Sequence, residues 1–106
     1  MPKRRPEEES DTQTVTEEQV RTEKPRLWKV LLHNDDFTTM EFVIRVLQEV
    51  FGRPEGEATE LMLQVHTRGF CLAGVYTFEI AETKVHRVQQ MAEAAEFPFL
   101  STMEPE

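Results

Sequence analysis

A regular spacing of apolar residues begins only after the first quarter of the chain and then continues to its end. Residues 1–25 hold only Met1, Val15 and Val20 as apolar side chains, among proline, glutamate, threonine, glutamine and lysine. So few apolar groups cannot offset the conformational entropy that ordering would cost. We therefore expect a flexible N-terminal extension over residues 1–25 and a single core domain over residues 26–106.

Within the core domain the spacing of apolar residues changes several times between the alternation typical of a strand and the repeat typical of a helix. Alternating residues at 26–33 predict a strand that has apolar side chains on both faces near its middle. The spacing predicts helices over about 38–51, 54–66 and 79–95, and strands over 70–78 and 97–103. The order β-α-α-β-α-β without a repeat predicts an α+β fold with helices on one face of a small sheet.

A short polar run joins the first strand to the first helix. Asn34, Asp35 and Asp36 follow the strand, and Thr38 with Glu41 has the spacing of a capping box, which makes Thr38 the predicted N-cap. Amide and carboxylate oxygens are therefore expected to gather in one small region. Such oxygens favour a cationic group over a phosphate.

Composition narrows the classes of partner. The formal net charge of −8 disfavours nucleic acid and anionic membranes as partners, because both would repel the protein. Cys71 is the only cysteine, so no intramolecular disulfide can form and the cytoplasm is the expected compartment. The basic residues near Met1 are followed by glutamates and not by an apolar segment, and no apolar run is long enough to span a bilayer.

His66 ends the second predicted helix beside an apolar stripe. If the two helices form a hairpin, the end of the second returns toward the start of the first, and His66 can face Asn34. An imidazole nitrogen, an amide oxygen and a carboxylate all accept hydrogen bonds, and an ammonium group has three donors. The residues expected below them are apolar: Leu32, Met40, Val43, Met62 and Val65. The sequence thus predicts a polar rim over an apolar pocket.

Three separate segments resemble one family. They read NDDFTTMEFV from Asn34, MLQVH ending at His66, and AETKV from Ala81. In this spacing they are similar to ClpS, the adaptor of the ATP-dependent Clp protease. The resemblance implies a three-stranded antiparallel sheet with three helices on one face, as in a ribosomal stalk C-terminal domain. It also implies a monomeric adaptor, without catalysis or cofactor, that binds the free α-amino group and bulky first residue (Phe, Tyr, Trp or Leu) of N-degron substrates and delivers them to ClpA–ClpP.

The resemblance further implies roles for individual residues. Contacts to the α-amino group are expected from Asn34, Asp35, Asp36 and His66. A hydrophobic pocket is expected from Leu32, Thr38, Met40, Val43, Met62, Val65 and Phe99. Met40 would exclude β-branched first residues, and Glu79 and Lys84 would dock on the ClpA N-terminal domain. The chain departs from the family at Thr39, where proline is usual, and at Phe99, whose ring replaces an aliphatic residue and would narrow or reshape the pocket.

Other interpretations stay open on the residues alone. Two acids before a helix are commonly an ordinary turn, a histidine at a helix end commonly interacts with the helix dipole, and methionines commonly fill a core. His33, Asp35, Asp36 and His66 could bind a divalent metal in a small hydrolase, although no HExxH or CxxC spacing is present. A structural interaction domain of the ribosomal-stalk type, without a ligand pocket, is the other alternative. No nucleophile paired with a base is evident, which disfavours an enzyme.

Overall fold

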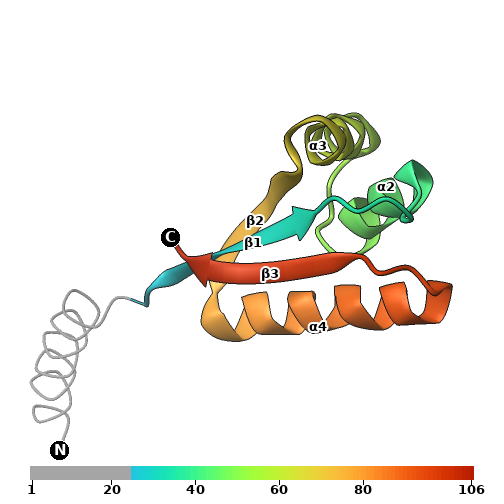
Figure 1. Ribbon diagram of the computed structural model, residues 1–106. Helices are drawn as coiled ribbons and strands as arrows, with labels where there is room; N and C mark the ends of the chain where they lie inside the picture. Colours follow the sequence, from blue (N-terminus) through green and yellow to red (C-terminus); the bar gives the residue numbers. More distant parts are fainter. Residues whose placement is uncertain (1–24) are drawn as a thin grey trace, which may run out of the picture.

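The predicted order of elements is confirmed by a computed structural model, which describes residues 25–106. In chain order the elements are β1 (Leu27–His33), α2 (Met40–Glu49), α3 (Glu55–Arg68), β2 (Phe70–Thr77), α4 (Phe78–Ala95) and β3 (Leu100–Pro105) (Figure 1). Apart from Pro25, the predicted flexible extension over residues 1–25 lies outside the described residues.

The sheet is antiparallel, and β1 lies at its centre in the order β2-β1-β3. Alternate side chains of β1 point toward the helices, and Val30 and Leu32 are completely buried. The pairing of β1 with β2 shifts after Val30, where Ala73 has no partner in the register. At this β-bulge the consecutive residues Ala73 and Gly74 are both buried, whereas strict alternation along β2 would bury only one of them.

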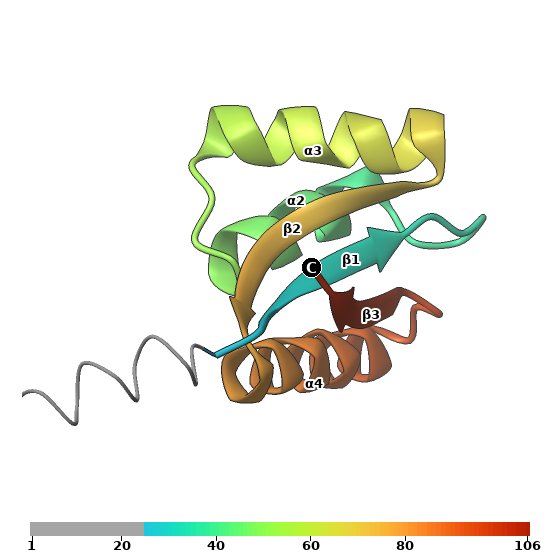
Figure 2. The same cartoon turned by 90° about the vertical axis from the view of Figure 1, so that its left-hand side faces the viewer.

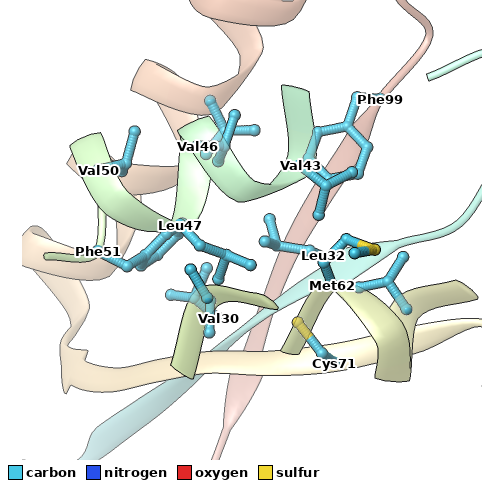
Figure 3. Packing of buried hydrophobic residues seen from close by; sticks show 14 of the residues in the cluster. Val30, Leu32, Val43, Val46, Leu47, Val50, Phe51, Met62, Cys71 and Phe99 are labelled. Carbon is cyan, nitrogen blue, oxygen red and sulfur yellow. The ribbon is translucent and has the colours of Figure 1, made fainter. Parts of the chain in front are cut away.

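Helices cover one face of this sheet. Helix α4 runs along the sheet and contacts all three strands, whereas α3 lies beside β2 and packs on α2 (Figure 2). Side chains from the strands and from all three helices form one buried cluster, part of which is seen in Figure 3. On the opposite face, Leu72 and Leu100 are 40% and 56% exposed. The three-stranded, three-helix α+β fold expected from the sequence is therefore present.

The start of α2 differs from the prediction by one residue. Thr39, and not Thr38, is the N-cap: its side-chain oxygen accepts a hydrogen bond from the backbone N–H of Phe42 at 3.1 Å. The predicted capping box of Thr38 with Glu41 is wrong because the Thr38 hydroxyl donates instead to Asp35 at 2.7 Å.

The last strand also begins later than predicted. Phe97 and Phe99 precede β3, and their rings pack edge-on against Phe42 at centroid distances of 5.0 and 6.0 Å. Both rings are therefore held by aromatic packing against α2 and not by strand pairing. Helix α3 extends two residues beyond His66, and Gly69 then ends it at a positive φ of 95° that glycine adopts without strain.

Candidate functional site

A small pocket opens between the end of β1, the start of α2 and the C-terminal half of α3. Its volume, including the open mouth, is about 200 Å³, and its lining consists of Asn34, Thr38, Met40, Val43, Met62, Val65 and His66. All seven were expected in the site from the sequence. Part of this volume is open solvent, so the enclosed space is far below the roughly 300–1,000 Å³ of sites for drug-sized ligands.

Backbone geometry brings Asn34 and His66 to the same pocket. The backbone N–H of Asn34 donates to the carbonyl of Gly69 at 2.8 Å, which joins the end of β1 to the end of α3. Helix α2 packs on α3, and only a short segment connects the two helices, as expected for a helical hairpin. Asn34 and His66 thus line one pocket, and the prediction that their side chains face each other stays a prediction.

The mouth of the pocket carries polar groups that the protein leaves open to a ligand. Asn34 and His66 are both exposed, and the hydrogen bonds of the neighbouring loop go to Asp35 and to neither of these two side chains. An amide oxygen and an imidazole nitrogen can both accept from a cationic donor. The mouth is therefore suited to a small group with several N–H donors.

Asp35 organises the loop that leads into α2. Its Oδ1 accepts from the backbone N–H groups of Phe37 and Thr38 at 2.8 and 2.7 Å, and its Oδ2 accepts from the Thr38 hydroxyl at 2.7 Å. Desolvation by partial burial opposes these bonds, but the bonds prevail and lower the pKa of Asp35 below its ordinary value. Asp35 is thus a carboxylate at neutral pH with most of its lone pairs already used. Asp36, beside it, is exposed.

The walls of the pocket are apolar and differ in mobility. Val43, Met62 and Val65 are buried, whereas Met40 is the first residue of α2 and is 46% exposed. Because methionine is unbranched and flexible, Met40 can adjust at the mouth while the buried residues keep the pocket shape.

Two predicted pocket residues lie behind these walls. Leu32 and Phe99 are buried and are absent from the lining; in Figure 3 the Phe99 ring lies next to Val43, and Leu32 lies next to Met62. Their side chains support the lining from the core. Their direct contact with a ligand stays a prediction.

Glu79 and Lys84 both lie on α4, but Glu79 is exposed to solvent and Lys84 contacts other parts of the protein. Glu79 is exposed in the first turn of the helix. The Lys84 ammonium donates to the carbonyl of Val50 at 2.7 Å and lies 5.1 Å from the centroid of the Tyr76 ring. Lys84 therefore binds the C-terminal end of α2, a contact that sequence reasoning missed because it joins residues far apart in the chain.

The metal-hydrolase alternative has little support among residues 25–106. In this part of the chain no three His, Cys, Asp or Glu side chains group closely enough to hold a metal ion. His33 is engaged elsewhere, with its Nε2 at 2.7 Å from the Thr102 hydroxyl. None of the helices in residues 25–106 has the length and apolar character needed to cross a membrane.

Comparison with known proteins gives one consistent result. The sequence pattern of the family described as "ATP-dependent Clp protease adaptor protein ClpS" matches residues 23–102. An adapter protein ClpS from Desulfatibacillum aliphaticivorans is 59% identical over 92 residues, which are 87% of this chain and 88% of the relative. One from Myxococcus xanthus is 48% identical over 100 residues, 92% of this chain and 94% of the relative.

A solved structure agrees with these relatives. The structure of Agrobacterium tumefaciens ClpS2 bound to L-phenylalaninamide superposes with a TM-score of 0.76 at 40% sequence identity, covering 78% of this chain and all of that one. Sequence pattern, relatives and fold thus point in one direction. The chain belongs to the ClpS family of ATP-dependent Clp protease adaptor proteins.

Proposed function

We propose that this Clp protease adaptor binds the free α-amino group and the bulky hydrophobic first residue of N-degron substrates and delivers them to ClpA–ClpP. The observation that carries the proposal is a small pocket with apolar walls that has Asn34 and His66 at its mouth. The ligand of the related ClpS2, L-phenylalaninamide, carries a free amine next to a phenyl ring. The first residues proposed are Phe, Tyr, Trp and Leu.

In this proposal the α-ammonium group lies at the mouth. Asn34 and His66 accept its hydrogen bonds, while the negative charges of Asp35 and Asp36 favour a cation. Hydrogen bonds to a charged group contribute about 1.5–3 kcal/mol each, and burial of one large apolar side chain contributes about 1.5–3 kcal/mol. Association itself costs free energy, and a net binding free energy of about 8 kcal/mol corresponds to micromolar affinity. Both parts of the ligand are needed to reach it.

The pocket walls give the selectivity. Val43, Met62 and Val65 surround the first side chain, with Leu32 and Phe99 behind them. Met40 at the mouth would clash with a branch at the β-carbon and so exclude Ile and Val. Behind this wall the Phe99 ring packs edge-on against Phe42.

Delivery requires a second surface, which we place on α4. Glu79 is exposed there and free to meet the ClpA N-terminal domain. Lys84 would contribute to this surface chiefly by holding the end of α2, because its ammonium already donates to Val50. A monomer acting in the cytoplasm is the form we expect.

Calorimetry with two ligands tests the proposed function. L-Phenylalaninamide is expected to bind with micromolar affinity. N-acetyl-L-phenylalaninamide should show no measurable binding, because acetylation removes the ammonium group and its donors. Equal affinity for the two compounds would refute the role of the mouth.

A further inference from the structure

The face of the sheet that points away from the helices carries a group of apolar side chains. Val30 and Leu32 are buried on the helix side, so Leu31 and His33 point to the opposite face. Residues paired directly across strands share a face. The register therefore adds three apolar partners of Leu31 and His33 to this face: Phe70, Leu72 and Leu100. We call Leu31 and these three residues the sheet patch.

The sheet patch is open to solvent. Phe70 is 47% exposed, and Leu72 and Leu100 are exposed to a similar degree. In Figure 2 helix α2 lies behind the sheet, and no helix of residues 25–106 lies in front of it. Single exposed apolar side chains are ordinary, but a contiguous group on one face is typical of an interaction surface.

The polar side chains within and beside the sheet patch already have partners. His33 Nε2 lies 2.7 Å from the Thr102 hydroxyl, and the Lys29 ammonium lies 3.9 Å from the Glu104 carboxylate. An apolar segment that covered this face would therefore leave few hydrogen-bonding groups without a partner. The opposite charges of Lys29 and Glu104 also give the face no strong preference for a charged ligand. The face is thus suited to an apolar segment.

The sheet patch lies at the same end of the sheet as the mouth of the pocket. Phe70 directly follows Gly69, whose carbonyl accepts a hydrogen bond from the backbone N–H of Asn34 at 2.8 Å. In Figure 2 the end of α3, the start of β2 and the loop after β1 lie together at this end. The pocket encloses little space, so most of a polypeptide bound there must leave it across the surrounding surface. The sheet patch is continuous with one side of this exit.

We propose that the sheet patch binds an apolar segment of the substrate polypeptide, a few residues after its first residue. The inference rests on the proposed function and extends it to the chain that follows the first residue. That chain must pass from the helix-covered side of the sheet to the open side, roughly the 10 Å thickness of one packed layer. About three extended residues span this distance, so the segment is expected to begin near the fourth residue of the substrate.

Calorimetry with two peptides tests the inference. Phe-Gly-Gly-Leu-Ala-Leu-amide and Phe-Gly-Gly-Ser-Ala-Ser-amide share a first residue and differ only where the sheet patch is expected to act. Wild type should bind the apolar peptide about fivefold more tightly, as expected for partial burial of two leucine side chains. Phe70→Thr removes the ring and keeps a residue suited to a strand, and it should reduce this preference to less than about twofold.

Phe78→Thr is the matched control. Phe78 is 45% exposed, but it lies beyond the other end of β2, at the start of α4. This variant should keep the preference for the apolar peptide. L-Phenylalaninamide lacks the segment and should bind wild type, Phe70→Thr and Phe78→Thr equally.

The exposed ring of Phe37, in the loop before α2, marks the other route out of the pocket. Phe37→Ala should keep the preference for the apolar peptide. If Phe37→Ala loses the preference and Phe70→Thr keeps it, the chain leaves past the loop and the inference is overturned.

Failure of this inference and failure of the proposed function give different results. If wild type binds L-phenylalaninamide but binds the two peptides equally, the inference is overturned and the proposed function stands. If wild type does not bind L-phenylalaninamide, the proposed function itself fails. Should Phe70→Thr not fold, Leu100→Thr provides the same test, because Leu100 is exposed on the other side of His33. A full preference for the apolar peptide in Leu100→Thr would then overturn the inference.

Discussion

The two ends of helix α2 are treated in opposite ways by the surrounding protein. At its N-terminal end, the loop groups are satisfied by Asp35 and Thr39, yet Asn34 and His66 remain exposed beside a pocket. At its C-terminal end, the carbonyl of Val50 is bound by the Lys84 ammonium. At the N-terminal end, which we call the open end, two hydrogen-bond acceptors stay exposed, and our proposal places the ligand there. At the C-terminal end, which we call the closed end, the protein supplies the donor itself. Binding and stability are therefore expected to depend on different ends of one helix.

The largest effect is expected from removing an acceptor at the open end. His66→Ala should reduce affinity for L-phenylalaninamide tenfold or more, because a hydrogen bond to a charged group is lost. Its stability toward urea should change little, since the side chain is exposed.

The control for this variant is His86→Ala, since His86 is an exposed histidine on α4. It should retain the affinity of wild type for L-phenylalaninamide. If His66→Ala binds L-phenylalaninamide as tightly as His86→Ala does, His66 is not an acceptor for the ligand and the N-terminal end of α2 has no greater role in binding than the C-terminal end.

The closed end should respond in stability and not in ligand affinity. Lys84→Met keeps much of the side-chain packing but leaves the Val50 carbonyl without its donor, which should reduce the free energy of unfolding by about 1–3 kcal/mol. Urea denaturation measures this loss, and calorimetry should show unchanged affinity for L-phenylalaninamide. Lys29→Met is the matched control: it removes a surface ion pair with Glu104 at 3.9 Å and should cost about 0–1 kcal/mol. Equal losses in the free energy of unfolding for the two variants would show that the hydrogen bond from Lys84 does not stabilise the end of α2.

The smallest effect concerns the acid stability of the loop at the open end. The pKa of Asp35 is lower in the folded protein than its ordinary value, so the carboxylate stabilises the fold above about pH 4, and this contribution disappears as the pH falls through the folded value. In urea unfolding between pH 3 and 7, the free energy of unfolding should therefore fall less steeply with acidification for Asp35→Ala than for wild type. Asp36→Ala should follow the wild-type curve, because the loop hydrogen bonds go to Asp35. Identical curves for all three proteins would mean that Asp35 does not hold the loop.

Much of the fold and of the pocket could be predicted because both depend on local signals. Apolar spacing marked every helix and strand to within a few residues. The pocket residues lie in two short segments, around Met40 and before His66, whose helical spacing places their apolar side chains on shared faces. A helical hairpin then suffices to bring the two segments together.

The remaining features depend on competition between neighbours or on distant contacts. Thr38 and Thr39 are equally good N-caps by type, and only the position of Asp35 decides between them. Phe97 and Phe99 have the composition of a strand, but the ring of Phe42 holds them before β3 begins. The contact of Lys84 with Val50 requires the complete tertiary structure and leaves no trace in sequence spacing.

The hydrogen bond from Asn34 N–H to the Gly69 carbonyl has a consequence for how this site can evolve. It is made by main-chain atoms, so the separation between the two halves of the mouth does not depend on which side chains occupy them. Mutation can therefore exchange the groups that meet a ligand while the frame keeps its dimensions. Related chains can therefore differ in ligand preference through the side chains at the mouth, while the main-chain spacing of the mouth stays the same.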